Sequence, residues 1–312
     1  MGADPTRITA ADFVTPPEFR GLLLSASEAG RVGGLRLELV ARAGGTGLGS
    51  CYQQVPLRVL PPFPLGDGRP ALVYLLNPTA GLLDGDGQLV CLTARAGTRA
   101  VVVGQSATRI HPCPVGFATQ QWRIRVEAGA VLVVLPGPSI PFARCRYYQR
   151  VAVELDEGAG FVWGDVGLAG RYARGAASER FRFAALVQEF QVRRRGQLVF
   201  RDHLAWRGPW DEATAAWHFG GGSAWGSVFA TEPAPDTGGA RFTTAGGDTC
   251  VRWTGHAEQV TADVVRAALQ LAAALSDGPS DGWGFRDELA PVHWFSVQRD
   301  LRTPSPPNTP GG

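Results

Sequence analysis

Histidine and cysteine are the side chains best suited to hold a transition metal, and both are scattered along this sequence. None of the histidines stands three or four residues from another, so no two share one face of a helix. His111-Pro112-Cys113 offers one imidazole and one thiolate to a metal. Two ligands are too few for a site, and such a pair also suits a plain strand end. The five histidines are His111, His203, His218, His256 and His293.

The five cysteines are odd in number, widely spaced and never arranged as CxxC. That pattern favours neither a disulfide framework nor a zinc site, and it predicts a reducing compartment. Residues 1–17 contain no apolar stretch of the signal-peptide type, and no run approaches the ~18 apolar residues of a membrane span. We therefore expect a cytoplasmic protein that does not enter a membrane.

Three glycine-containing segments begin like known catalytic or binding motifs and then depart from them. Residues 45–49 (GTGLG) differ from the dinucleotide motif GxGxxG, and residues 104–108 (GQSAT) lack the second glycine of the nucleophile motif GxSxG. Residues 84–87 (DGDG) start like a calcium loop, but Gln88 and Leu89 take the next ligand and glycine positions. These segments predict no active site.

Charge excludes further classes of function. Every basic residue is arginine, so the chain has no P-loop of the GxxxxGK[ST] type, whose lysine contacts the phosphates. The net charge of +2 is too small to indicate nucleic acid or a membrane surface as a partner. We expect a chain that is not an enzyme, and any nucleotide hydrolysis must come from a partner.

The elements that must position these residues are mainly strands. One group of segments alternates apolar and polar residues, which is typical of strands with one buried face. A second group is continuously apolar, which favours strands covered on both faces. With 41 Gly and 23 Pro in 312 residues, turns must be frequent. The alternating segments are residues 35–39, 122–126 and 151–155, and the apolar ones are residues 71–76, 101–103 and 131–135.

Three similar turns indicate that the strands repeat. Turns around Gly97, Gly129 and Gly158 each join two strand-like segments, and these glycines are 32 and 29 residues apart. A period of this size favours stacked sheet layers around a shared core. Three unrelated hairpins are the alternative, because glycine is the usual residue at a turn that needs positive φ.

Local signals place a hairpin and a helix in the C-terminal half. The hairpin joins residues 188–194 to residues 197–203 through Arg195-Gly196. The helix covers residues 261–275, with Thr261 as its N-cap. Its broad apolar stripe, which includes Leu271 and Leu275, either packs on the sheet or meets a partner.

Glycine, proline and small polar residues predict loops between these elements. The predicted loops are residues 44–50, 205–226 and 231–239. We find no convincing linker, so residues 1–301 are expected to form a single β-rich domain. Residues 302–312 (RTPSPPNTPGG) are expected to be a disordered tail.

From Gln54 onward, short motifs follow one another in a specific order. Residues 74–86 (YLLNPTAGLLDGD) are followed by residues 105–110 (QSATRI), then by residues 126–142, and Gly170-Arg171 closes the series. The series resembles the UreD (UreH) family of urease accessory proteins, whose pattern is roughly LLNPxGGxxGGD, PxAxK/R, GAxLEWLPxxxIxF and LGR. The predicted helix and residues 291–294 also fit the family's ending, so the resemblance covers nearly the whole chain.

The resemblance implies an all-β fold of β-helix-like stacked sheets with one or two C-terminal α-helices. It also implies a non-catalytic scaffold that binds a UreF-like accessory protein and, through it, a UreG-like GTPase that carries nickel. Such an assembly docks on apo-urease and assists nickel insertion. Nickel would be in transit, so no permanently bound cofactor is expected.

Four polar positions match family positions and are candidates for a transient nickel path: Asp86, Ser106, Asp165 and Asp202. Structural roles are the alternative, since Asp86 is suited to cap a glycine-rich turn and Asp202 to a solvated strand face. Residues 132–134 read Leu-Val-Val where the family often has Leu-Glu-Trp, which puts in doubt a path that relies on that carboxylate. Leu271 and Leu275 are candidates for contact with the UreF-like partner.

Two other classes of function remain open from the residues alone. A β-helix carbohydrate-active enzyme would usually carry paired carboxylates in a cleft and a secretory segment, and the scattered acidic residues argue against it. A structural or adhesive β protein is the second alternative, and a gene position beside urease subunits would decide against it.

Overall fold

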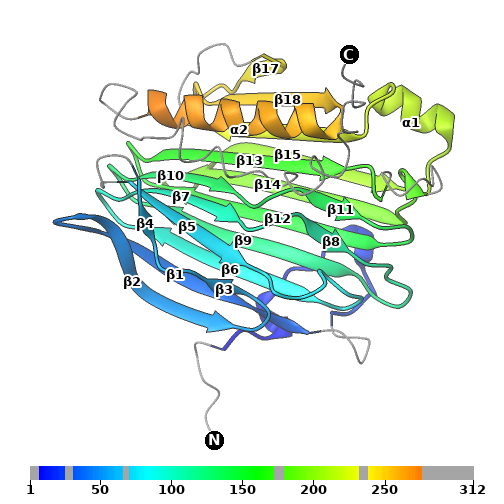
Figure 1. Ribbon diagram of the computed structural model, residues 1–312, viewed down its shortest axis with the longest axis horizontal. Helices are drawn as coiled ribbons and strands as arrows, with labels where there is room; N and C mark the ends of the chain where they lie inside the picture. Colours follow the sequence, from blue (N-terminus) through cyan, green and yellow to red (C-terminus); the bar gives the residue numbers. More distant parts are fainter. Residues whose placement is uncertain (1–6, 25–30, 66–69, 172–178, 232–237, 276–312) are drawn as a thin grey trace, which may run out of the picture.

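Two β-sheets face each other across a shared interior, and a long helix covers one of them (Figure 1). The computed structural model describes residues 7–24, 31–65, 70–171, 179–231 and 238–275. The expected all-β, β-helix-like fold with C-terminal helices is confirmed. Residues 291–294 and 302–312 lie outside the described residues.

The first sheet, called sheet A here, has seven strands in the order β15-β14-β12-β9-β6-β1-β2. Its five central strands run parallel, and each edge strand pairs antiparallel with its neighbour in a hairpin. The strands are β1 (Val32–Arg42), β2 (Gly45–Gln54), β6 (Gly87–Ala94), β9 (Ala118–Val126), β12 (Arg146–Leu155), β14 (Ala185–Arg194) and β15 (Gln197–Arg207).

The second sheet, called sheet B here, has eleven strands, and its main path is β17-β18-β16-β13-β10-β7-β5-β3. Short strands β4, β8 and β11 pair beside this path. The strands are β3 (Arg58–Val59), β4 (Phe63–Pro64), β5 (Ala71–Leu76), β7 (Arg99–Gly104), β8 (Thr108–Ile110), β10 (Val131–Leu135), β11 (Ser139–Pro141), β13 (Gly160–Leu168), β16 (Ala224–Ala230), β17 (Ala240–Thr243) and β18 (Thr249–Gly255).

The predicted stacking of repeats is correct. Each of the three turns carries the chain from a strand of sheet A to a strand of sheet B, and Gly97, Gly129 and Gly158 all have positive φ, between 71° and 76°. Backbone hydrogen bonds join one turn to the next, for example from Val131 N to Thr98 O (2.8 Å). The turns therefore form successive coils that wind around a common interior.

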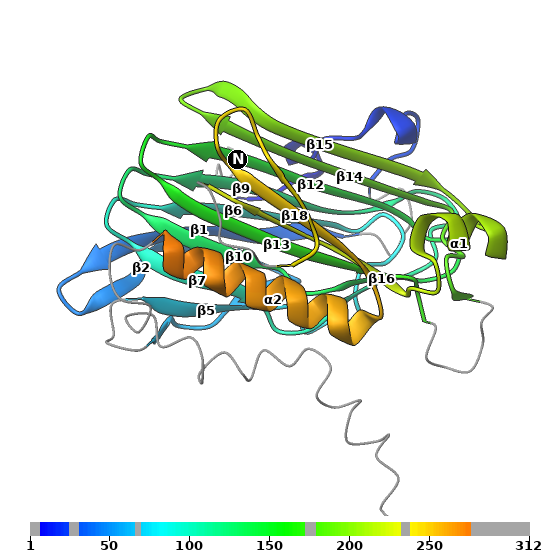
Figure 2. The same ribbon diagram turned by 90° about the horizontal axis from the view of Figure 1, so that it is seen from above.

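Alternating side chains divide the core into two layers. Residues on the inner faces of the sheets, among them Trp122 of β9 and Trp163 of β13, form the larger core; these two rings meet edge to face at 5.4 Å. The outward residues of sheet B pack under helix α2 (Ala257–Ala274), which lies along that sheet (Figure 2). The central strands of sheet B are thus covered on both faces, as their continuous apolar runs predict.

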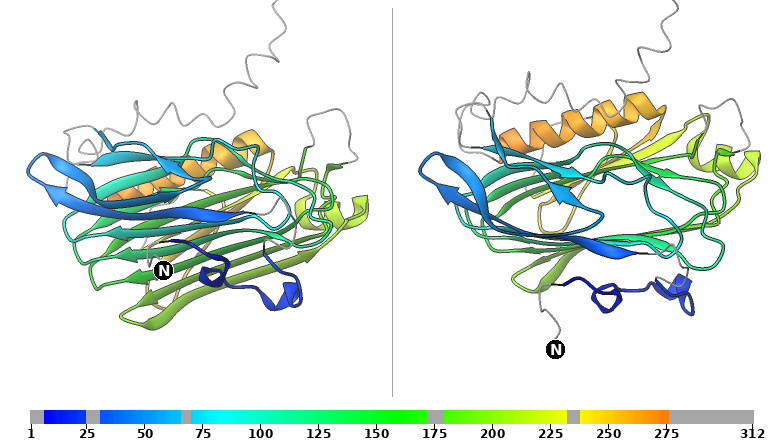
Figure 3. Two further views of the ribbon diagram at one scale, coloured as in Figure 1. Left: turned by 90° about the horizontal axis from the view of Figure 1, so that it is seen from below. Right: turned by 60° about the horizontal axis from the view of Figure 1, so that its bottom comes forward.

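Residues 7–24, called the strap here, cross the outer face of sheet A (Figure 3). They contain two 3-10 helices, η1 (Ala10–Asp12) and η2 (Pro17–Phe19). The side-chain amide of Gln54 exchanges hydrogen bonds with the backbone of Ile8, both at 2.9 Å, and Gln121 does the same with Val14. Each glutamine amide thus makes the two hydrogen bonds that the backbone of a neighbouring strand would otherwise make.

Two predicted loops are partly wrong. Residues 45–50 belong to β2, an edge strand whose glycines give no alternating pattern. Within residues 205–226 the chain completes β15, forms helix α1 (Glu212–Phe219) and begins β16. Asp211 caps α1 by accepting from Thr214 N (2.8 Å), a local signal that was present in the sequence. Most of the predicted loop 231–239 lies outside the described residues.

Helix α2 begins four residues before the predicted start. Thr261 is not its N-cap but lies inside the helix, where its hydroxyl donates to Ala257 O (2.7 Å). The residue at the N-cap position is His256, whose side chain makes no capping bond. Neither helix in the described part of the chain is long and apolar enough to span a membrane.

Candidate polar route between the sheets

A row of four glutamines crosses the inner face of sheet A. Gln88, Gln120, Gln149 and Gln188 lie on adjacent parallel strands and are paired in register. They occupy the same side of their strands as the apolar core residues, so their amides point between the sheets. Gln88, Gln120 and Gln149 are buried, and Gln188 is half-buried.

Hydrogen bonds join these amides in two pairs. Gln120 Nε2 donates to Gln88 Oε1 (3.2 Å), and Gln188 Nε2 donates to Gln149 Oε1 (2.8 Å). The indole of Trp122 donates to Gln120 Oε1 (3.3 Å). Gln88 Nε2 is buried and has no hydrogen-bond partner among the described residues. A buried amide without a partner is costly, which indicates that this end of the row meets a polar environment.

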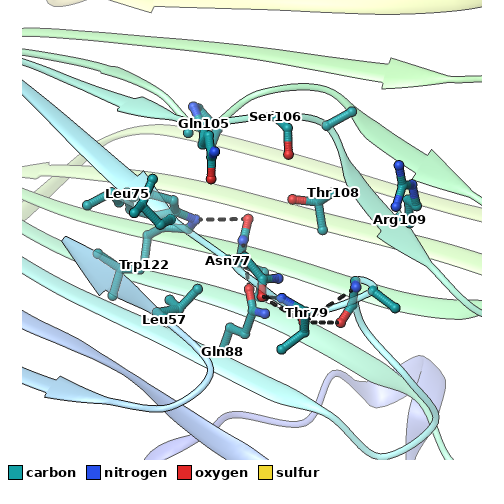
Figure 4. Close-up of a pocket in the computed structure, with 18 residues that line it drawn as sticks. Leu57, Leu75, Asn77, Thr79, Gln88, Gln105, Ser106, Thr108, Arg109 and Trp122 are labelled. Carbon is teal, nitrogen blue, oxygen red and sulfur yellow. Dashed lines mark hydrogen bonds between the residues drawn. The ribbon is translucent and has the colours of Figure 1, made fainter. Parts of the chain in front are cut away.

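A pocket lies at that end of the row. It has a volume of about 60 Å³, enough for several water molecules, and reaches Gln88 and Gln120. Figure 4 shows Asn77 and Gln88 on one side of the pocket and Gln105 and Ser106 on the other. The candidate residue Ser106 is therefore exposed at the mouth of a pocket that leads to the buried amides.

The candidate residue Asp165 lies at the far end of the row. It projects from β13 toward sheet A, where its Oδ2 accepts from Gln188 Nε2 (3.1 Å) and its Oδ1 accepts from Val166 N (3.0 Å). Trp225 Nε1 donates to Gln188 Oε1 (3.3 Å), so this amide is held on both sides. Burial raises the pKa of Asp165 to about 6, although hydrogen bonds from Gln149, Val166 and Gln188 act in the opposite direction.

On sheet B, further polar residues lie between Asp165 and the protein surface. Asp165 is paired in register with Ser227, and Ser227 with Arg252. Arg252 Nη2 reaches across to the candidate residue Asp202 of β15 and forms an ion pair at 2.5 Å. β15 and β18 lie at the same end of the stacked sheets, in the upper part of Figure 1.

We call this set of side chains the polar layer. It crosses the interior at one level of the strands and ends at a surface on both sides. Its members are Ser106, Gln88, Gln120, Gln149, Gln188, Asp165, Ser227, Arg252 and Asp202.

The fourth candidate, Asp86, is held by its own turn. Its carboxylate accepts from Leu83 N and from Arg31 N, both at 2.7 Å. Burial raises the pKa of Asp86, and these backbone bonds oppose the shift. It immediately precedes β6 and stands two residues before Gln88, but it does not line the pocket. Its contacts are those of a turn cap at the entrance side of the polar layer.

The side chains of His111 and Cys113 each contact a backbone carbonyl. His111 Nε2 lies 3.1 Å from Ala80 O, and the Cys113 thiol donates to His111 O (3.3 Å). Burial raises the pKa of Cys113 to about 11. Within the described residues, no three His, Cys, Asp or Glu side chains cluster closely enough to hold a metal ion.

The remaining sequence candidates lie on the other side of sheet B. Leu271 is 2% exposed and packs between α2 and the sheet, while Leu275 is partly buried beside it. Val133 stands where the family motif has glutamate, and it too faces α2. A glutamate at this position would therefore project from the face of β10 that points away from the polar layer.

The glutamines were not among the residues predicted from the sequence, although their spacing carries a signal. Gln88, Gln120 and Gln149 each stand nine residues before the turn glycines Gly97, Gly129 and Gly158. The same period that places the turns above one another therefore also places the amides above one another. Single glutamines between apolar residues look like solvent-facing positions until both sheets are in place.

Comparison with known proteins identifies relatives over most of the chain. Residues 31–278 match the family model of the UreD urease accessory protein. The chain is 34% identical over 275 residues to "Urease accessory protein UreD" from Deinococcus radiodurans, covering 82% of this chain and 97% of that protein. It is 32% identical to "Urease accessory protein UreD 2" from Synechococcus sp. (57% of this chain, 66% of the relative). It is 36% identical to the UreD protein of Opitutus terrae (55% and 62%).

Proposed function

This chain is a member of the UreD urease accessory protein family, and from that premise we propose that it assists urease maturation by passing nickel ions along the polar layer. The relatives are named as accessory proteins and not as enzymes, in agreement with the expectation of a non-enzymatic chain. Membership in this family also argues against a carbohydrate-active enzyme or an adhesive β protein.

The continuity of the polar layer is the observation that supports nickel passage. An amide or carboxylate that is buried without full hydrogen bonding costs about 1–3 kcal/mol, so a fold selected for stability alone would place apolar residues there. Instead, the row runs from the pocket at Ser106, through Gln120 and Gln188, to Asp165. The polar groups follow one another by hydrogen bonds and strand register between two surfaces of the protein, and this arrangement supports the proposed path.

The chemistry of the layer suits transit better than storage. Carboxylate, amide and hydroxyl oxygens are acceptable but weak ligands for Ni²⁺, whereas clustered thiolates and imidazoles would retain it. A conducting path must bind an ion well enough to admit it and weakly enough to release it. Asp165 and Asp202 supply single carboxylates, Asp202 in an ion pair with Arg252, and Ser227 supplies a hydroxyl beside Asp165.

The partners that we propose for this path are those that the family resemblance implies. They are a UreF-like protein and, held by it, a UreG-like GTPase, and the lack of a P-loop of the GxxxxGK[ST] type in this chain agrees with GTP hydrolysis by such a partner. Apo-urease would receive the metal. We place this assembly in the cytoplasm, where the scattered free cysteines stay reduced.

Substitution of the carboxylates tests the proposal. The triple variant Asp86→Asn, Asp165→Asn, Asp202→Asn removes charge while keeping the size of the side chains. We expect it to fold and to assemble with its partners, yet to yield urease with several-fold less nickel per active site. Metal analysis of purified urease after coexpression gives the readout, and co-purification of the partners shows that assembly is intact.

Asp156→Asn is the matched control, because Asp156 pairs with Arg125 on the solvent side of sheet A. It should leave urease activation unchanged. Normal nickel content with the triple variant would refute the path. Failure of each single variant to fold would instead favour a purely structural role for these carboxylates.

A further inference from the structure

The ion pair between Asp202 and Arg252 closes the far end of the polar layer. It joins the edge strand of sheet A to β18 of sheet B, with Nη2 and Oδ2 2.5 Å apart. The Arg252 side chain is 47% exposed and that of Asp202 37%, so the pair stands at the boundary between interior and solvent. Ser227 lies between Arg252 and Asp165 on the inner face of sheet B.

This pair sets the charge at the end of the layer. A carboxylate that accepts from a guanidinium offers its oxygens less readily to a metal ion, and the arginine charge repels a cation that approaches. An isolated aspartate at the same place would instead attract and hold a divalent ion. Arg252 also has a second favourable contact, since its guanidinium carbon lies 5.5 Å from the centre of the Phe242 ring. The side chain can therefore leave Asp202 without losing every partner.

We propose that Arg252 is a built-in competitor for Asp202 that prevents a divalent cation from being retained where the polar layer reaches the surface. The proposal rests on nickel passage as the function of the layer. An ion that arrives from Asp165 displaces the guanidinium from Asp202, and the return of the guanidinium expels the ion. Release from this chain then needs no change in the fold, because an exposed ion pair is weak enough to exchange.

Nickel binding to the isolated full-length chain tests this competition without urease or partners. Isothermal titration with nickel chloride is carried out on the wild type, on Arg252→Gln and on the double variant Arg252→Gln, Asp202→Asn. We expect Arg252→Gln to bind nickel about tenfold more tightly than the wild type, because Asp202 loses its competitor. The double variant should return to the wild-type affinity.

Arg193→Gln is the matched control. Arg193 pairs with Glu154 at similar exposure, 43% and 47%, but on the outer face of sheet A. It should leave nickel affinity unchanged. Arg252→Lys, which keeps the charge but not the planar guanidinium, should lie between wild type and Arg252→Gln and gives a second test if the glutamine variant folds poorly.

Equal affinity for Arg252→Gln, Arg193→Gln and the wild type would overturn the proposal. So would tight binding that persists in the double variant, because the extra ion would then not be on Asp202. Neither result bears on nickel delivery by the triple Asp→Asn variant. The titrations therefore test the role of Arg252, and the nickel content of urease tests the path.

Discussion

Asp165 illustrates the free-energy cost of burying an acidic side chain in the polar layer. It is almost completely enclosed, yet it keeps an acidic side chain among apolar neighbours such as Trp163. Gln188 and the backbone of Val166 donate to it, but they do not offset its loss of hydration, so its pKa rises from 3.8 to about 6. The fold thus carries a group that would be more stable if it were neutral.

The pH dependence of stability follows from the sign of this shift. The folded pKa of Asp165 exceeds the unfolded one, so the contribution of Asp165 to the free energy of unfolding should fall as pH rises from about 4 to about 6 and then stay level. Asp165→Asn should remove this decline. At pH 7.5 the variant should gain up to roughly 3 kcal/mol, the equivalent of moving the pKa from 3.8 to about 6.

Urea denaturation between pH 4 and pH 8 measures this effect, and Asp156→Asn is again a suitable control. The difference between Asp165→Asn and the wild type should vanish at the acidic end. A variant that is less stable than the wild type at pH 7.5 would show that the ionised carboxylate is stabilising, contrary to the burial argument.

Helix α2 is the element whose role the sequence leaves open. Its stripe packs on β13, β16 and β18, so most of the apolar face that the pattern predicts serves the fold. Gly164 and Gly226 allow this close approach, because a Cβ at either position would meet Val264 at 3.1 Å or less. Leu275 at the end of the helix stays partly buried and remains a candidate for contact with a UreF-like partner.

Two leucines of α2 should therefore respond differently to charge. Leu271→Asp places a carboxylate under the helix and should cost about 3–5 kcal/mol in the free energy of unfolding, through a lost apolar contact and a buried charge. Leu275→Asp should cost clearly less. The exposed neighbour Gln270→Asp should change stability by less than about 0.5 kcal/mol. Chemical denaturation followed by circular dichroism separates the three.

Equal losses for Leu271→Asp and Gln270→Asp would contradict the packing of α2 on sheet B. If Leu275→Asp remains folded and still co-purifies with the UreF-like partner, Leu275 is not part of that interface.

The whole molecule is held together across its interior. Trp122 of sheet A meets Trp163 of sheet B in the core. At the end of β14, Arg194 pairs at 2.7 Å with Asp248, which is 1% exposed and lies in the turn before β18. Because every coil contributes a strand to both sheets, the two sheets share the larger core between them.

Unfolding should accordingly be a single event. Scanning calorimetry should give one transition whose van't Hoff and calorimetric enthalpies agree, in line with the single domain expected from the sequence. Two separated transitions, one for the coils and one for β16–β18 with α2, would contradict this interpretation. Arg194→Gln should lower the midpoint without splitting the transition, since Asp248 would be left as a buried, unpaired charge.

The sequence by itself determined the elements whose signals are local. Period-two alternation located the strands, and the glycines near residues 97, 129 and 158 located the stacked turns, because positive φ is a property of single residues. The apolar stripe of α2 was also evident, although Thr261 was assigned as its cap. The glycine-rich edge strand β2 was missed, because it is held by pairing with β1 and not by its own side chains.

Only the tertiary structure decided which polar residues meet. Register between strands brings Gln120 beside Gln88 and places Asp165 in line with Ser227 and Arg252, and it depends on hydrogen bonds between segments far apart in the chain. The pairing of Asp202 with Arg252 depends further on how the two sheets close. A one-residue slip would turn every one of these side chains to the opposite face, so composition and local pattern could not reveal the polar layer.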